Sequence, residues 1–109
     1  MLRVQRFKGF DQDEINLDSI ELRNLLIGLI WELSNQFLVP KKPLKKMKHT
    51  GDLRGAYSVK FDIQGFHNRY RLVFDYLPKD EPAEILRLIA VGPRFEDWVY
   101  KAAANRLNS

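Results

Sequence analysis

The spacing of apolar residues changes from a period of about 3.6 to a period of 2 along this chain, which restricts the folds it can adopt. In the first half, apolar side chains recur at steps of three and four residues: Leu22, Leu25, Leu26, Leu29, Leu33 and Phe37. This spacing predicts an amphipathic helix over residues 19–38, stopped by Pro40. Asp18 is the expected N-cap, with Glu21 at capping-box spacing. We expect the apolar stripe to be core; any exposed part is a candidate partner surface.

The second half alternates apolar and polar side chains, as strands do. Residues 57–62 alternate, and after a glycine-containing turn at 65–68 the alternation resumes over 70–76. Two such runs joined by a short turn predict an antiparallel hairpin. The mostly apolar run 85–91 predicts a third strand, buried on both faces.

The remaining segments carry weaker signals. We expect a short first strand within 2–7, a polar loop over 11–18, and a final helix over 95–107. Residues 40–55 contain two prolines and two glycines, and we expect a basic connector with at most one helical turn. Together these elements predict an α+β fold: a small antiparallel sheet packed against one or two N-terminal helices and a C-terminal helix, in a single domain over 1–109.

Composition removes several classes of protein. The chain has no cysteine, which excludes disulfides, thiolate metal sites and cysteine nucleophiles. At 45% apolar residues it can build a core without crosslinks. Charged residues interrupt the N-terminus, unlike a signal peptide, and no apolar stretch is long enough to cross a membrane. We therefore expect a cytoplasmic protein with no membrane partner.

Charge is unevenly distributed. The net charge is +4, which favours nucleic acid or an acidic partner. Acidic residues predominate between Asp11 and Glu32, whereas five lysines follow within eight residues: Lys41, Lys42, Lys45, Lys46 and Lys48. Such a cluster is most often a solvated connector. In a functional role, it attracts the nucleic-acid backbone irrespective of base sequence.

Known cofactor and metal motifs are absent. There is no glycine-rich phosphate loop and no cluster of metal ligands, so no metal or other cofactor is expected. The two histidines, His49 and His67, lie in different predicted loops. Nothing in the sequence singles out a nucleophile.

The candidate site is a set of basic residues on the sheet. Alternation places Lys60 and Arg71 on the polar faces of their strands, Arg94 follows the third strand, and Tyr100 and Arg106 lie on the final helix. Converging on one concavity, these side chains suit a phosphate, because guanidinium groups match its oxygens. The alternative is that each is ordinary surface, with Tyr100 a packing residue and Arg106 a charge favoured at a helix C-terminus.

Two sequence blocks resemble the RelE/ParE superfamily of bacterial toxins. The first, over 53–76, reads LRGAYSVKFDIQGFHNRYRLVFDY: leucine-x-glycine, a lysine-containing strand, then tyrosine-arginine-leucine-valine. The second, over 88–107, reads LIAVGPRFEDWVYKAAANRL: a strand, glycine-x-arginine, and a tyrosine six residues later. Both occur in the family's order and cover roughly the C-terminal half, and the RelE-like branch is favoured. The N-terminal half is similar only in kind.

The resemblance implies a type II toxin neutralised by a cognate antitoxin. In the RelE branch it also implies cleavage of mRNA on the ribosome without a metal, by attack of a 2′-hydroxyl on the adjacent phosphate. By position, Lys60 is implied in charge stabilisation and deprotonation, and Arg71 in holding the phosphate. Arg94 is implied in transition-state and leaving-group stabilisation, and Tyr100 in stacking on a base. Candidate RNA- or ribosome-binding residues are Lys41, Lys42, Lys45, Lys46, Lys48 and Arg54.

One departure from the RelE pattern leaves two functions open. RelE-type enzymes often carry a second lysine two residues before the first, where this chain has Ser58. His49 or His67 is a candidate for the missing proton chemistry, although neither matches a family position. The alternative to the nuclease is a ParE-like toxin that inhibits DNA gyrase by binding. Retention of Lys60 and Tyr100 favours the nuclease.

Overall fold

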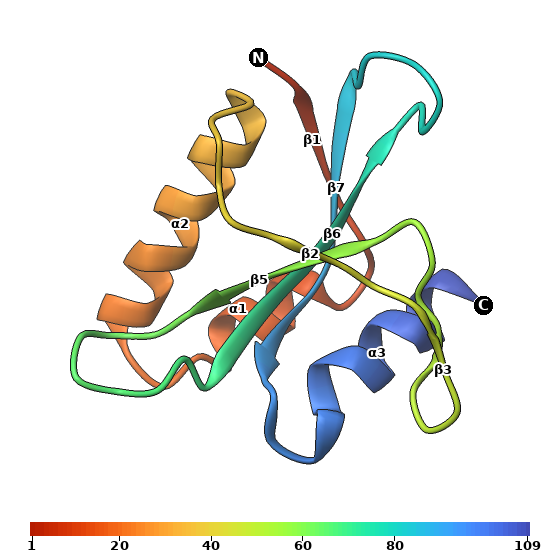
Figure 1. Cartoon of the computed structure of the whole chain (residues 1–109). Helices are drawn as coiled ribbons and strands as arrows, with labels where there is room; N and C mark the ends of the chain where they lie inside the picture. The colour runs from red at the N-terminus through yellow and green to blue at the C-terminus, as the bar shows by residue number, and fades with distance from the viewer.

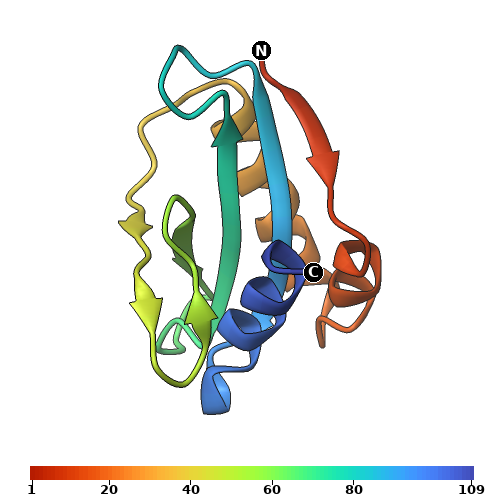
Figure 2. The ribbon, with the colours of Figure 1, turned by 90° about the vertical axis from the view of Figure 1, so that its right-hand side faces the viewer.

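A five-stranded sheet lies between two layers of helices in the computed structural model, which describes residues 1–109 (Figures 1 and 2). The strand order is β1-β7-β6-β5-β2. The bounds are β1 (Arg3–Arg6), β2 (Lys42–Pro43), β5 (Tyr57–Phe61), β6 (Tyr70–Leu77) and β7 (Ile85–Pro93). A separate hairpin comprises β3 (Lys46–Met47) and β4 (Gly51–Asp52). The predicted α+β fold, a sheet covered by helices, is confirmed.

The predicted β5–β6 hairpin is confirmed, and its register fixes which side chains are neighbours. Lys60 pairs with Arg71, and Ser58 pairs with Val73. β7 lies antiparallel to β6 and is buried along most of its length, as its apolar run predicts. β1 joins the far side of β7 in parallel, so the sheet is mixed. The sequence of β1 does not predict this parallel pairing, because its four residues are all exposed and of mixed polarity.

Helix α2 (Ile20–Ser34) covers one face of the sheet (Figure 2). Its Leu22 and Leu26 belong to the larger buried cluster, with Leu72 and Phe74 of β6. The helix therefore forms where the periodic leucines predict, because they have an apolar sheet face to cover.

The N-cap of α2 differs from the prediction. Ser19, not Asp18, is the cap: its backbone is extended (φ −142°, ψ 157°), and its hydroxyl accepts a hydrogen bond from the Leu22 N–H at 3.2 Å. Asp18 instead accepts a hydrogen bond from the Tyr70 hydroxyl at 3.2 Å. This contact and burial both raise the pKa of Tyr70, and burial is the larger cause.

Helix α2 also ends earlier than Leu38. Gln36 adopts a left-handed conformation (φ 60°), and its N–H donates to the carbonyl of Leu33. The N–H of Phe37 reaches back to the carbonyl of Glu32 at 2.9 Å. These two bonds form a Schellman motif, which stops the helix before Pro40 can do so.

The apolar stripe of α2 is not entirely core, contrary to expectation. Leu25 is 41% exposed and Phe37 is 50% exposed. Ile27 and Trp31 are also exposed, and Trp31 packs edge-on against Phe37 at 5.1 Å between ring centroids. The helix has more apolar surface than the sheet can cover, so it presents an apolar face to solvent.

The loop predicted for 11–18 is wrong in its first part, which is helix α1 (Phe10–Ile15). Phe10 is fully buried and anchors this helix against the sheet. Asp13 is also buried. Six residues are too few to establish a helical period, which is why the pattern missed this element.

The opposite face of the sheet is covered by α3 (Trp98–Leu107), as predicted for the final helix (Figure 1). A 3-10 turn, η1 (Phe95–Asp97), precedes it. Val73 of β6 and Val99 of α3 share the second buried cluster. The β3–β4 hairpin packs beside α3, and it replaces the helical turn allowed for in the connector. None of the helices is both long and apolar enough to span a membrane.

Candidate phosphate-binding surface

Arg71 begins the candidate site from an almost buried position on β6. It is 7% exposed, and its Nη1 donates hydrogen bonds to the carbonyls of Asn68 and Tyr70. These bonds fix the guanidinium at the end of the β5–β6 loop. The side chain lines a pocket of about 630 Å³ that also contains Arg94 and His67.

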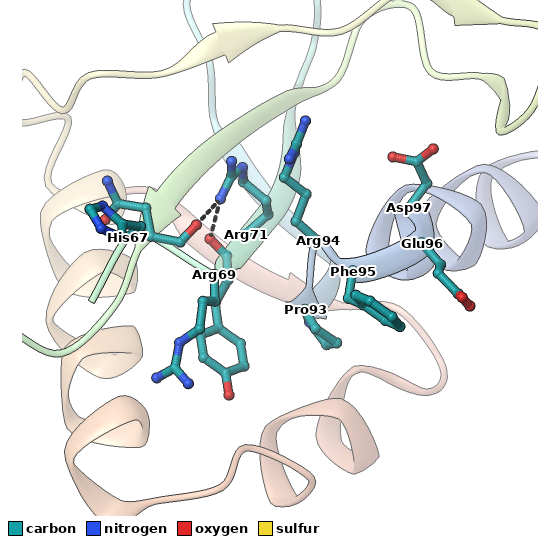
Figure 3. A pocket seen from close by; sticks show the side chains of 10 residues that line it. His67, Arg69, Arg71, Pro93, Arg94, Phe95, Glu96 and Asp97 are labelled. Atoms are coloured by element: carbon teal, nitrogen blue, oxygen red, sulfur yellow. Dashed lines mark hydrogen bonds between the residues drawn. The ribbon is translucent and has the colours of Figure 1, made fainter.

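Arg94 reaches the same pocket from the end of β7. Its backbone N–H donates to the carbonyl of Arg69 at 2.8 Å, which ties the β7–η1 junction to the start of β6. In Figure 3 Arg94 and Arg71 reach the same pocket from neighbouring strands, and the Arg71 guanidinium turns towards the carbonyls to which it is bonded. Neither arginine forms an ion pair, because no carboxylate oxygen lies within 4.0 Å of its guanidinium nitrogens. Two cations so placed can bind one phosphate from two sides.

Tyr100 and Arg94 line a second pocket, of about 370 Å³, between α3 and the lysine-rich connector. Lys42 and Lys45 also line it. Its other walls are partly apolar and include Leu53. Arg94 therefore lines both pockets, whereas Arg71 lines only the first and Tyr100 only the second.

Lys60 lies in a third hollow, of about 560 Å³, with Lys41 and Lys42. As the cross-strand partner of Arg71, it projects from the same face of the sheet. The third hollow shares Asn68 with the first pocket and Lys42 with the second. We call the surface around these three adjoining hollows the basic surface; it comprises Lys41, Lys42, Lys45, Lys60, Arg71, Arg94 and Tyr100.

Three residues predicted to bind RNA or the ribosome do not line the basic surface. Lys46 and Lys48 lie in and just after β3, both exposed. Arg54 folds back on Asp52, with Nη2 and Oδ2 2.7 Å apart. Its hydrogen bonds lower the pKa of Asp52 to about 2.

Arg106 follows neither alternative: it does not reach the concavity, and it is not a free surface charge at the helix end. Its guanidinium lies against the buried carboxylate of Asp13, and the two charges neutralise each other. The prediction missed this because Asp13 was assigned to a solvated loop.

The position of the missing lysine, Ser58, is buried and pairs in register with Lys42 of β2. Side chains of paired residues lie on the same face of a sheet, so the Lys42 side chain is next to Ser58 and diagonal to Lys60. The sequence indicates only a general RNA-binding role for Lys42, because a strand of two residues is too short to show an alternating pattern.

The site also includes residues that no sequence pattern indicated. Asn68 contributes its carbonyl to Arg71. Asp97 lines both pockets that contain Arg94. The histidines lie in different pockets: His67 near Arg71 and His49 near Tyr100. No three histidine or acidic side chains are grouped as metal ligands.

Comparison with solved structures identifies the fold. A mutant of the E. coli toxin RelE in the free state aligns over 97% of both chains, with a TM-score of 0.64 and 20% sequence identity. The chain has the RelE fold. The same fold occurs in the RelBE2 toxin–antitoxin complex from Mycobacterium tuberculosis, with a TM-score of 0.60 and 19% identity over 85% of this chain and 98% of that one.

A third structure, of the conserved hypothetical protein HP0892 from Helicobacter pylori, aligns with a TM-score of 0.52 and 20% identity, over 88% of this chain and 98% of that one. No family model matches the sequence, and neither does any curated protein. The RelE fold predicted from two short sequence blocks is therefore confirmed by three-dimensional similarity, at sequence identities of 19–20%.

Proposed function

We propose that this protein is the toxin of a type II toxin–antitoxin system and that it cleaves mRNA on the ribosome. The observation that carries the proposal is the convergence of Lys60, Arg71, Arg94 and Tyr100 around adjoining hollows on one face of a RelE fold. A shift of one residue in the β5–β6 register would place Lys60 and Arg71 on opposite faces of the sheet, so their proximity depends on the register observed.

The reaction needs proton transfer and charge stabilisation, which these side chains can supply. A 2′-hydroxyl attacks the adjacent phosphorus; the O–P bond to the 2′-oxygen forms as the bond to the 5′-oxygen breaks. Lys60 helps to remove the 2′-hydroxyl proton, and Arg71 holds the phosphate. Arg94 stabilises the charge that develops on the phosphate and on the leaving 5′-oxygen. The leaving 5′-oxygen takes up a proton from solvent, so the products are a 2′,3′-cyclic phosphate and a free 5′-hydroxyl.

Three further features support an RNA substrate. The Arg71 guanidinium is already held by two carbonyls, so little ordering remains when phosphate binds. Tyr100 is half-buried beside Arg94, where its ring can stack on a base next to the bound phosphate. The lysines of the connector add attraction to the ribosomal RNA backbone. Such a toxin acts in the cytoplasm.

A cognate antitoxin is part of the proposal. One of the similar structures is a toxin–antitoxin complex. The exposed apolar face of α2, with Ile27 and Trp31, is a candidate contact for it, because large exposed apolar patches mark interaction sites.

Gyrase inhibition is the second candidate function. The observation in its favour is Ser58, which leaves β5 with one lysine, Lys60. A toxin that acts by binding needs the fold and its arginines but no catalytic lysine.

Paired induction in a bacterial host separates these functions. Wild type, Arg94→Ala and the control Arg3→Ala are expressed, growth is followed, and transcript 5′ ends are mapped. Arg3 is an exposed arginine on β1, at the other edge of the sheet. We expect growth arrest with new cuts in translated messages for wild type and Arg3→Ala, and neither for Arg94→Ala. Arrest without cuts contradicts the nuclease and supports gyrase inhibition.

A further inference from the structure

Asp97 is an acidic residue in a place where neither helix capping nor ion pairing explains it. It is the N-cap residue of α3, yet its side chain makes no capping hydrogen bond. Its backbone is left-handed (φ 58°, ψ 24°), whereas a capping aspartate is normally extended. Glu96 before it is also left-handed (φ 51°). Two adjacent strained residues in the wall of a pocket are typical of a functional constraint.

The surroundings of Asp97 are basic, but it pairs with no cation. It lines the pocket between α3 and the connector together with Lys42, Lys45 and Arg94. None of the seven ion pairs of the protein involves Asp97. In Figure 3 its carboxylate and the Arg94 guanidinium project to the same side of the loop, whereas Glu96 points away. A free carboxylate repels phosphate, so it suits a part of the ligand that offers hydrogen-bond donors.

The pocket has the chemistry expected of a base-binding site. Leu44 and Leu53 form apolar walls, Tyr100 offers an aromatic ring, and the volume of about 370 Å³ is large enough to admit a base. Arg94 is shared with the neighbouring phosphate pocket, so a base held here belongs to a nucleotide at or next to the reacting phosphate.

We infer that this pocket binds a guanine base of the message and that Asp97 selects it; the inference rests on the proposed nuclease function. Guanine carries two adjacent donors on its Watson–Crick edge, N1–H and the N2 amino group, which match the two oxygens of one carboxylate. In adenine, cytosine and uracil, the donor on that edge lies next to acceptors, which the carboxylate repels.

The test uses purified wild-type protein and ribosomes programmed with messages that differ at one position of the decoding-site codon, guanine against adenine, at each position in turn. At one position, wild type is expected to cut the guanine message about tenfold faster or more, the discrimination typical of a bidentate base contact. Asp97→Asn reduces that ratio to near one and keeps the rate on the adenine message. Asparagine tolerates the left-handed conformation, so the fold is retained. Glu96→Gln, the neighbouring acid that points away, keeps the ratio.

The outcomes separate the inference from the function on which it rests. If wild type cuts messages without preferring guanine, or if Asp97→Asn keeps the preference, the guanine pocket is wrong and the nuclease stands. If wild type cuts none of the messages, the nuclease is wrong and the guanine pocket with it.

Discussion

Asp13 of α1 and Arg106 of α3, 93 positions apart in the sequence, form a buried two-bond ion pair. Nη1 of Arg106 donates to Oδ2 of Asp13 at 2.6 Å, and Nη2 donates to Oδ1 at 3.0 Å. The same Asp13 oxygen accepts from the Val91 N–H, and Arg106 also donates to the carbonyl of Ile89. The pair therefore attaches both helices to β7, and it fixes the helix that carries Tyr100.

Removing either charge of this pair is expected to destabilise the fold. Asp13→Ala leaves the Arg106 guanidinium without a carboxylate partner in a site where Asp13 is only 4% exposed, which typically costs about 3 kcal/mol. Denaturant unfolding of Asp13→Ala measures this loss. In the control Asp11→Ala, an exposed acid paired with Arg6, the expected change is under about 1 kcal/mol. Equal losses in both variants contradict the structural role.

The double variant Asp13→Leu/Arg106→Met separates charge burial from packing. It removes both charges together, so no unpaired charge stays behind, and it is expected to be more stable than Asp13→Ala. Both variants lack the Asp13–Val91 hydrogen bond, so a double variant less stable than Asp13→Ala would show that the contacts of Arg106, including its bond to the Ile89 carbonyl, contribute more than its unpaired charge costs.

Acid is expected to weaken the β5–β6 loop through Asp62. Hydrogen bonds from the Arg69 side chain, at 2.8 and 3.0 Å, lower the pKa of Asp62 from 3.8 to about 2. Because the folded pKa is depressed, the stabilisation is complete above about pH 4 and is lost as the pH falls towards 2; Arg69 is exposed, so solvent screening limits it to about 1 kcal/mol or less. Asp62→Asn lacks it, so the stability difference from wild type should shrink over that interval. A difference independent of pH contradicts this assignment.

The sequence predicts the parts of this fold that have a repeating pattern long enough to read. The leucines of α2 and the alternation of β5 and β6 predict those elements, and alternation places Lys60 and Arg71 on the polar faces of their strands, which the observed register then pairs. Element ends are less predictable, because they depend on single conformations such as that of Gln36, a residue type with no preference for a left-handed turn.

Contacts between distant segments leave no such pattern. Nothing in the sequence links Asp13 to Arg106, so neither interpretation of Arg106, as a member of the site or as a surface charge, anticipates their ion pair. The pairing of Lys42 with Ser58 depends on a strand of two residues within a segment predicted to be a connector. The resemblance to known toxins predicts the four candidate catalytic positions, but not the carboxylate of Asp97 between them.

Lys42 is expected to supply the cation that Ser58 lacks. The two residues are cross-strand partners beside Lys60, so exchanging them as Lys42→Ser/Ser58→Lys keeps an ammonium group within the same part of the basic surface. We expect Lys42→Ala to slow cleavage on programmed ribosomes by roughly tenfold, about one charged hydrogen bond, and the exchange to restore most of the rate. Lys8→Ala, an exposed lysine outside the basic surface, is the control, with little effect. An exchange variant as slow as Lys42→Ala contradicts the compensation.

Tyr100 is expected to act through its ring and not through its hydroxyl. A base stacked on an aromatic ring gains about 1–3 kcal/mol, so Tyr100→Ala should slow cleavage by roughly 10–100-fold, whereas Tyr100→Phe keeps the ring and stays within about twofold of wild type. Lys101→Ala, an exposed neighbour on α3, controls for changes to the helix. Thermal unfolding of each variant separates lost stability from lost stacking, because Tyr100 also packs against the α3 cluster. If Tyr100→Phe is as slow as Tyr100→Ala, the hydroxyl takes part in proton transfer and stacking is not the main role of this residue.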